Sequence, residues 1–223
     1  ITGGGGGIGA ALAKQYAALG CNIALLDINE AGAEQVAGLC RKLGVEALAL
    51  RCDVTSAQSC EEAVAQTRQC FGQLDIVVAN AGLTHLSLFE DTELAVIRRV
   101  MEVNFFGAVN IAKASLPDLL ESRGQYVVMS SVAGFCPLPM RTGYAASKYA
   151  VRGFFETLRT ENRHCGLGVL IVCPSYVSTD IGKHALGGNG DSATHQRPEA
   201  GQAISADTAA QTIVRAAENR RDF

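Results

Sequence analysis

The chain has 223 residues, of which 48% are hydrophobic and 18% are charged. This suits one globular α/β domain with a full core. The formal net charge of -3 comes without a basic stripe, which argues against a nucleic-acid partner, and no apolar run is long enough to span a membrane.

The chain opens on a glycine run, TGGGGGIG at 2–9, that leads directly into a predicted helix at 8–19. Glycine allows a tight turn and a close approach to a pyrophosphate, and the helix start offers free N–H groups. A flexible tail is the weaker alternative because the helix follows at once. A nucleotide-binding P-loop is excluded because Ala10 and Ala11 stand where it needs Lys and Ser or Thr. A turn of this kind needs a supporting strand, so we expect one before Ile1, with any targeting signal upstream.

The next two apolar runs, 23–26 and 47–50, end near acidic residues and flank a predicted helix at 31–43. Asp27 follows Gly9 by eighteen residues, where a carboxylate accepts hydrogen bonds from ribose hydroxyls and repels a 2′-phosphate. Ile28 adds no positive charge, so NAD is favoured over NADP; a solvated turn acid is the alternative. Asp53 is a candidate adenine contact or, almost equally, a helix-capping residue before Thr55.

A helix is predicted at 57–71, a buried strand at 76–79 that ends at Asn80, and a long helix at 94–120. Asn104 is a polar residue inside the otherwise apolar part of that long helix. Such a side chain must find hydrogen-bond partners if it is buried. It either anchors a water that relays protons or has a plain packing role.

The run 126–129 ends at Ser130 and Ser131, and a helix is predicted at 144–162. Tyr144 and Lys148 are four residues apart, which places a phenol and an ammonium on one face of that helix. A free tyrosine has a pKa of about 10, and a nearby cation favours the phenolate, so the pair can serve as a general acid/base. Ser131 can donate to the same substrate oxygen, whereas Ser130 is more easily read as structural.

A last run at 169–173 ends at Pro174, and the segment 182–204 is rich in Gly, Ser and Asn without a period. We predict that this segment is a mobile substrate loop. Strands and helices alternate, and the runs suit strands buried on both faces. The sequence therefore predicts a single Rossmann-type domain over 1–223, a doubly wound parallel sheet in three α/β/α layers. Strand ends in such a sheet share one edge, where ligands bind.

These motifs, in this order, resemble the short-chain dehydrogenase/reductase family in its short single-domain form. The resemblance runs from Thr2 to about Thr179 and includes the glycine turn, Cys52-Asp53-Val54, and Asn80-Ala81-Gly82. Asn104, Ser131, Tyr144 and Lys148 fall at the positions of the family's catalytic tetrad. Ser175 departs from the family's glycine after Pro174, and the family's final strand would lie after Phe223.

The resemblance implies a role for each matching residue. Tyr144 would be the general acid/base, Lys148 would lower the pKa of its phenol and hold the nicotinamide ribose, Ser131 would polarise the substrate oxygen, and Asn104 would hold the relay water. The implied cofactor contacts are Gly3, Gly7, Ile8, Gly9, Asp27, Ile28, Asp53, Val54, Asn80, Ala81, Gly82, Tyr144, Lys148, Pro174, Val177 and Thr179.

The expected substrate pocket comprises 133–141, the turn after Gly82 and the segment 182–204, and its residues are largely apolar. Such a wall suits a hydrophobic secondary alcohol or ketone. Arg141 and His85 are the polar exceptions, and His85 is expected more as a surface loop residue than as a substrate contact. The long helices carry surplus apolar surface, and their equivalents in the family pair across a two-fold axis. We therefore expect a homodimer or homotetramer.

The eight cysteines form no CxxC pair, which suits core residues of a reducing, cytoplasmic compartment. The four histidines lack metal-ligand spacing, so no metal site is predicted.

Two other function classes share part of this pattern. A non-catalytic NAD sensor or scaffold on the same fold would have no need of Tyr144 together with Lys148. A sugar-nucleotide epimerase or dehydratase would need a larger C-terminal domain than this chain has after Thr179.

Overall fold

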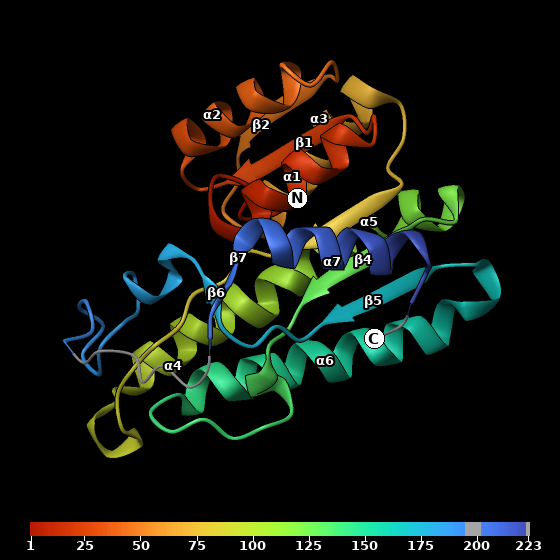
Figure 1. The fold of residues 1–223 in the computed structure, drawn as a ribbon. Coiled ribbons are helices and arrows are strands. Elements are labelled where there is room, and N and C mark those ends of the chain that lie inside the picture. The colour runs from red at the N-terminus through yellow and green to blue at the C-terminus, as the bar shows by residue number, and fades with distance from the viewer. Residues whose placement is uncertain (195–201, 222–223) are drawn as a thin grey trace.

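The computed structural model describes residues 1–194 and 202–221 (Figure 1). The strands are β1 (Ile23–Asp27), β2 (Ala47–Arg51), β3 (Ile76–Ala79), β4 (Gln125–Met129), β5 (Gly168–Val172), β6 (Val177–Ser178) and β7 (Ile204–Ser205). The α-helices are α1 (Gly7–Ala18), α2 (Glu30–Arg41), α3 (Ala57–Phe71), α4 (Leu94–Met101), α5 (Gly107–Ser122), α6 (Thr142–Asn162) and α7 (Ala206–Glu218).

The central strands are parallel. β1 pairs with β2, and β3, β4 and β5 pair in that order. Residues 1–3 lie between β1 and β3, because Thr2 bridges to Leu26 on one side and its N–H donates to Val78 O at 3.0 Å on the other. The carboxyl ends of the strands therefore meet at one edge, as the sequence predicts for a ligand-binding α/β sheet.

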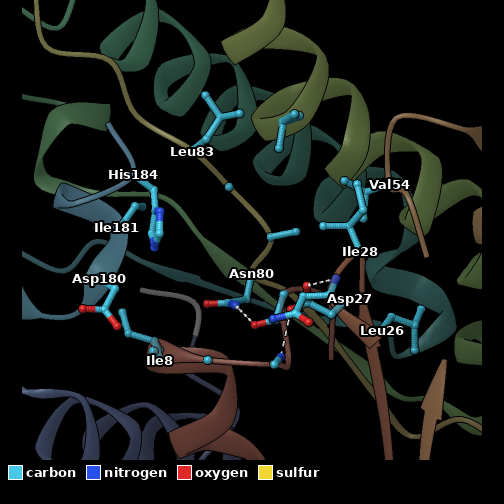
Figure 2. A pocket seen from close by; sticks show the side chains of 18 of the residues that line it. Ile8, Leu26, Asp27, Ile28, Val54, Asn80, Leu83, Asp180, Ile181 and His184 are labelled. Carbon is cyan, nitrogen blue, oxygen red and sulfur yellow. Dashed lines mark hydrogen bonds between the residues drawn. The ribbon is translucent and has the colours of Figure 1, made fainter. Parts of the chain in front are cut away.

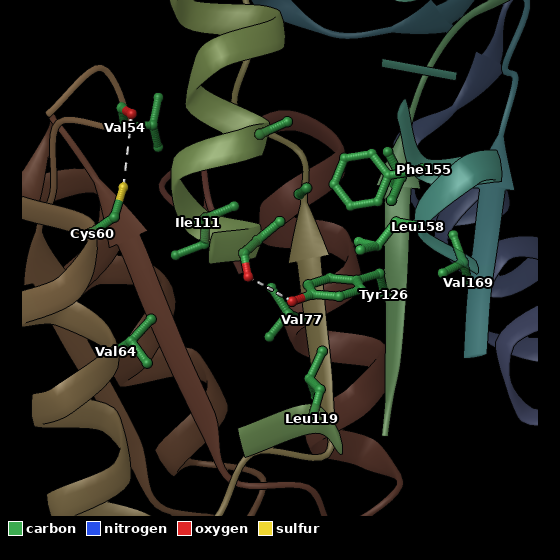
Figure 3. Close-up of a cluster of buried hydrophobic side chains, with 14 of the residues drawn as sticks. Val54, Cys60, Val64, Val77, Ile111, Leu119, Tyr126, Phe155, Leu158 and Val169 are labelled. Carbon is green, nitrogen blue, oxygen red and sulfur yellow. Dashed lines mark hydrogen bonds between the residues drawn. The ribbon is translucent and has the colours of Figure 1, made fainter. Parts of the chain in front are cut away.

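Helices cover both faces of the sheet, and each face has its own apolar core. The helices α1, α2 and α7 cover one face and α3, α5 and α6 cover the other (Figure 1), and Figure 3 shows side chains of the core under α3, α5 and α6. Alternate residues of β4 serve both cores: Tyr126 packs with α3, α5 and α6, and Val127 packs with α1, α2 and α7. The buried Tyr126 hydroxyl donates to Ala112 O at 2.8 Å, which satisfies its polar group. The predicted three-layer, doubly wound architecture is confirmed.

The predicted helix at 94–120 is wrong in one respect, because the structure divides it. α4 ends at Met101, a π-helical segment covers Glu102–Phe106, and α5 continues from Gly107. A π turn accommodates one additional residue in the helix and often occurs at functional positions. Here it contains Asn104, whose buried side chain bonds outside the helix rather than facing solvent.

The segment 182–204, which the sequence predicts as a mobile substrate loop, makes backbone hydrogen bonds to other parts of the chain, and its mobility stays a prediction. Its described part, 182–194, is tied to the preceding chain: Leu186 N donates to Thr84 O at 2.9 Å, and Glu93 N donates to Gly188 O at 2.8 Å. Ile204 belongs to β7, which pairs with β6, and residues 195–201 lie outside the described residues. α7, which the sequence reading missed, follows with Ser205 as its N-cap. In the part of the chain that the structure covers, each helix is too short or too polar for a membrane span.

Candidate active site

The glycine turn sits at the start of α1, at the edge where the strands end. Gly3 and Gly7 have φ of +63° and +52°, which L side chains rarely adopt. Gly6 occupies the N-cap of α1 without a side-chain cap, and the first turn has no acidic residue. The first N–H groups of α1 thus have no capping side chain. The helix start is a preformed site for an anion.

Neighbouring strand ends hold this turn in place. Asp27, at the end of β1, accepts a hydrogen bond of 2.8 Å from Gly5 N, and its other oxygen accepts one of 2.9 Å from Asn29 N. Asn80, directly after β3, donates through Nδ2 to Thr2 O and Gly3 O at 3.0 and 3.1 Å. Gly9 faces this network: a Cβ there would lie 2.8 Å from Asn80 Nδ2. The sequence could not assign this packing role to Gly9.

A cavity of about 550 Å³ opens in front of the turn (Figure 2). Most predicted cofactor contacts border it, namely Gly3, Gly7, Ile8, Asp27, Ile28, Asp53, Val54, Asn80, Ala81, Gly82 and Thr179. Gly9 does not border it. Leu83, Arg99 and His184 also border this cavity. Leu83 and His184 belong to segments that the sequence assigned to the substrate pocket, whereas Arg99 on α4 was predicted at neither site.

Asp53 borders the larger cavity, where its contact with an adenine stays a prediction, and it is not the cap of α3. Its carboxylate accepts hydrogen bonds from Thr55 N at 3.0 Å and Thr55 Oγ1 at 2.7 Å, and these bonds lower the pKa of the carboxyl. The residue that caps α3 is Ser56, which accepts from Ser59 N. Asp53 therefore shapes the turn before α3 while also lining the cavity.

A smaller cavity of about 100 Å³ adjoins the first, and Ile8, Asn80, Gly82, Thr179 and Ile181 border both. Ser131, Tyr144 and Lys148 line the smaller cavity, as do Pro174 and Val177. Three of the four predicted catalytic residues thus meet on one wall, although they come from the end of β4 and from α6. The phenol ring centroid of Tyr144 lies 5.8 Å from Lys148 Nζ.

Lys148 is a buried cation. Its side chain crosses to the end of β4, where Nζ donates to Met129 O at 2.7 Å, and only 5% of the residue is exposed. Burial lowers the pKa of the Lys148 ammonium to about 8, so it still carries its charge at neutral pH. A Cβ on Gly82 would lie 3.6 Å from this nitrogen, which places the ammonium against the turn after β3.

Ser130 and Ser131 make different hydrogen bonds at the end of β4. Ser130 Oγ donates to Lys148 O at 3.1 Å and so joins α6 to the strand end. Ser131 Oγ accepts from Ala133 N at 3.1 Å, which orients the hydroxyl and leaves its hydrogen available for donation.

Asn104 does not border either cavity. Its Oδ1 accepts from Leu83 N at 2.8 Å, and its Nδ2 donates to Leu83 O and Ser147 Oγ, both at 2.9 Å. The amide therefore joins α6 to the turn after β3 through direct hydrogen bonds. The relay water that the resemblance implies stays a prediction.

His85 corrects one expectation. We expected a surface loop residue, but the side chain is completely buried and accepts a hydrogen bond from Gly143 N at 2.9 Å. The sequence could not reveal this because His85 lies in an irregular segment whose burial depends on α6 and on residues 184–188. Arg141 lies in the small cavity as expected, with its guanidinium carbon 6.0 Å from the Tyr144 ring centroid.

A family model and several curated proteins are similar to this chain in sequence. The family model described as short chain dehydrogenase matches residues 1–187. An 11-beta-hydroxysteroid dehydrogenase A of Arachis hypogaea is 40% identical over 82% of this chain and 53% of its own length. This chain thus spans about half the length of such curated relatives.

Two solved structures have the same fold. An alcohol dehydrogenase from the archaeon Thermococcus sibiricus, complexed with 5-hydroxy-NADP, superposes with a TM-score of 0.84 at 28% identity, covering 96% of this chain and 86% of that one. A short chain dehydrogenase/reductase from Burkholderia phymatum, in complex with NAD, gives a TM-score of 0.88 at 26% identity, covering 99% and 85%.

The glycine turn at a helix start and the cavity along the strand ends define a dinucleotide-binding α/β fold. Within that class, the chain belongs to the short-chain dehydrogenase/reductase family of oxidoreductases.

Proposed function

We propose that this chain catalyses hydride transfer between NAD(H) and a secondary alcohol or ketone, with Tyr144 as general acid/base. The observation that carries the proposal is the meeting of Ser131, Tyr144 and Lys148 on the wall of a small cavity. That cavity adjoins the larger one in front of the glycine turn.

The larger cavity suits a dinucleotide. The uncapped start of α1 would hold the pyrophosphate, and Asp27 would accept hydrogen bonds from the adenosine ribose. The same carboxylate repels a 2′-phosphate, which favours NAD over NADP. When bound, the nicotinamide ring supplies or accepts the hydride.

The side chains on the smaller cavity would manage the proton. The ammonium of Lys148 stabilises negative charge on the Tyr144 phenol, so that oxygen can take a proton from an alcohol or return one to a carbonyl oxygen. The Ser131 hydroxyl would donate to the same substrate oxygen. Asn104 makes hydrogen bonds to Ser147 and Leu83 and borders neither cavity. From this position it would support the proposed relay water.

The substrate proposed is moderately hydrophobic. Val132, Leu138, Tyr176 and Ile181 supply much of the small cavity's lining, and Arg141 is a charged member besides Lys148. The name of the Arachis hypogaea relative adds hydroxysteroids to the compounds worth testing.

The test is a panel of secondary alcohols and ketones, steroids included, followed by the absorbance of the reduced nicotinamide with NAD and NADP in parallel. We expect turnover with NAD, and Tyr144→Phe should lower kcat by at least a thousandfold while NADH binding stays within threefold. Tyr149→Phe is the matched control, because Tyr149 lies on the same helix but is 48% exposed. If the native chain binds NADH yet turns over nothing on the panel, the sensor alternative replaces the enzyme.

A further inference from the structure

His85 makes a contact that the proposed chemistry does not use. It lies between β3 and α4, and its side chain is completely buried. The Nε2 atom accepts a hydrogen bond of 2.9 Å from the backbone N–H of Gly143, the residue directly before Tyr144. Because a helix leaves its first N–H groups without partners inside the helix, this imidazole satisfies one donor of the first turn of α6.

The hydrogen bond fixes the protonation state of the imidazole. An accepting Nε2 has no hydrogen, so a neutral ring carries its proton on Nδ1. Among the described residues, that buried Nδ1 has no hydrogen-bond partner. Burial, and secondly the charge of Arg141, lower the pKa of His85, which keeps the ring neutral and able to accept.

The contact is tight on both sides of Gly143. A Cβ at this glycine would lie 3.2 Å from His85 Nε2 and 3.3 Å from both Cγ1 and Cγ2 of Ile97 on α4. A side chain at position 143 would require the imidazole or Ile97 to move by a few tenths of an ångström. The start of α6 therefore lies between two neighbours, and Gly143 precedes Tyr144 by one residue and Lys148 by five.

The backbone around His85 is held as firmly as its side chain. Leu186 N donates to Thr84 O at 2.9 Å, and Leu86 N donates to Leu186 O at 2.8 Å, so His85 bridges to the segment after Gly182. Ser87 N donates to Met140 O at 3.1 Å, close to the start of α6. The segment 84–87 thus connects the start of α6 to the segment after Gly182, where His184 borders the larger cavity.

We propose that His85 is a positioning residue, which sets the location of the Tyr144 phenol by holding the start of α6 against the segment 84–86. This inference rests on the proposed function, in which Tyr144 moves the proton. His85 borders neither cavity, so it acts through Gly143 and not through the substrate or cofactor. A displaced helix start would misplace Tyr144 while leaving the glycine turn, and hence dinucleotide binding, intact.

The test compares His85→Phe, which fills the space but cannot accept, with His85→Gln, whose amide oxygen can reach the position of Nε2. We expect His85→Phe to lower kcat by at least tenfold, with the KM for NAD and the Kd of NADH within threefold, and His85→Gln to restore most of the lost kcat. His164→Phe, at an exposed histidine, is the control for the substitution itself. A His85→Phe variant that keeps both native kcat and native thermal stability would overturn the proposal, as would equal losses in both variants.

A measurement on the unaltered chain keeps the test decisive if His85→Phe does not fold. The ¹⁵N chemical shifts of the His85 ring at pH 7 should show a protonated Nδ1 and an unprotonated Nε2. A protonated Nε2 would overturn the proposal. This readout is also independent of turnover: absence of activity on every substrate sinks the proposed function, whereas the ring tautomer reports on the contact with Gly143 alone.

Discussion

Lys148 Nζ donates a hydrogen bond of 2.7 Å to the carbonyl oxygen of Met129, the last residue of β4. A carbonyl dipole compensates only part of the hydration that a buried ammonium loses, and the lowered pKa of Lys148 expresses that loss. The chain therefore keeps a cation where burial opposes it, beside Tyr144. This is the arrangement expected when a charge is retained for chemistry and not for stability.

Lys148→Met should consequently make the protein more stable and inactive. A thioether side chain of similar length has no charge to desolvate, so the free energy of unfolding at pH 7 should rise by about 1–3 kcal/mol. Turnover should fall by at least a hundredfold. Urea denaturation and the alcohol assay measure the two effects, and Lys113→Met, at an exposed position of α5, is the control. A less stable Lys148→Met variant would contradict this account.

The same residue predicts a pH dependence of stability. The pKa of Lys148 is about 8 in the folded chain against an ordinary 10.5. The cost of burying the charge is fully present below pH 8 and disappears above pH 10.5. The unfolding free energy of the native chain should therefore rise relative to that of Lys148→Met across this window, by roughly 3 kcal/mol. If the unfolding free energies of the two chains change by the same amount across this pH range, the ammonium is not desolvated.

Asp27 should decide the choice of dinucleotide. Asp27→Asn removes the negative charge near the ribose site, so the ratio of kcat/KM for NADP to that for NAD should rise at least tenfold, or about 1.4 kcal/mol. Asp53→Asn is the matched control at the end of the neighbouring strand, and it should change both values together because the Asp53 carboxylate is bonded to Thr55. A ratio unchanged by Asp27→Asn would remove the physical basis for preferring NAD.

Gly9→Ala should disrupt the turn from inside the protein. Its added methyl group would meet the Gly3 carbonyl oxygen and Asn80 Nδ2, so the turn or α1 must shift, at a cost of about 1–3 kcal/mol in stability. NADH affinity should fall with it. Gly38→Ala is the control, because a Cβ there meets no atom within 4 Å and should stabilise the exposed side of α2 by about 0.5–1 kcal/mol. Thermal melts of both variants measure these changes, and a Gly9→Ala variant as stable as the native chain would contradict the prediction.

His85 predicts a second pH dependence of stability, this time on the acidic side of neutral pH. Burial, and secondly the charge of Arg141, lower the pKa of His85 in the folded chain below the ordinary 6.5. Below pH 6.5 the unfolded chain binds a proton at this residue while the folded chain does not. The native chain should therefore lose stability relative to His85→Gln as the pH falls from 6.5 toward the folded pKa. His164→Gln should keep the native profile if the effect belongs to His85.

The expected homodimer or homotetramer is testable through exposed apolar side chains. Leu94 on α4, Phe106 in the π-helical segment and Tyr149 on α6 are 61%, 45% and 48% exposed. Sedimentation velocity should show an oligomer, and Phe106→Asp should weaken it. Leu39→Asp on α2, at a residue that is 46% exposed, should not. A monomer at micromolar concentration would refute the expectation.

The sequence by itself determined the alternation of strands and helices, the glycine turn, Asp27, and the pairing of Tyr144 with Lys148. These features are local: each depends on the period of apolar residues, on strand ends or on a spacing of one helical turn. The five main strands were accordingly predicted to within one residue at each end. The apolar period of α7 was equally local, with buried Ala210, Ile213, Val214 and Ala217, and it was overlooked.

Only the tertiary structure decided what surrounds those residues. The π-helical segment exists where Asn104 leaves the helix pattern to bond Leu83, and the burial of His85 depends on α6 and on Leu186 packing around it. Other chain segments pass close to Gly9 and Gly143, a property that no local pattern contains. Contacts between residues distant in sequence follow from packing the layers together, because a side chain's burial and hydrogen-bond partners depend on neighbours that its own segment does not specify.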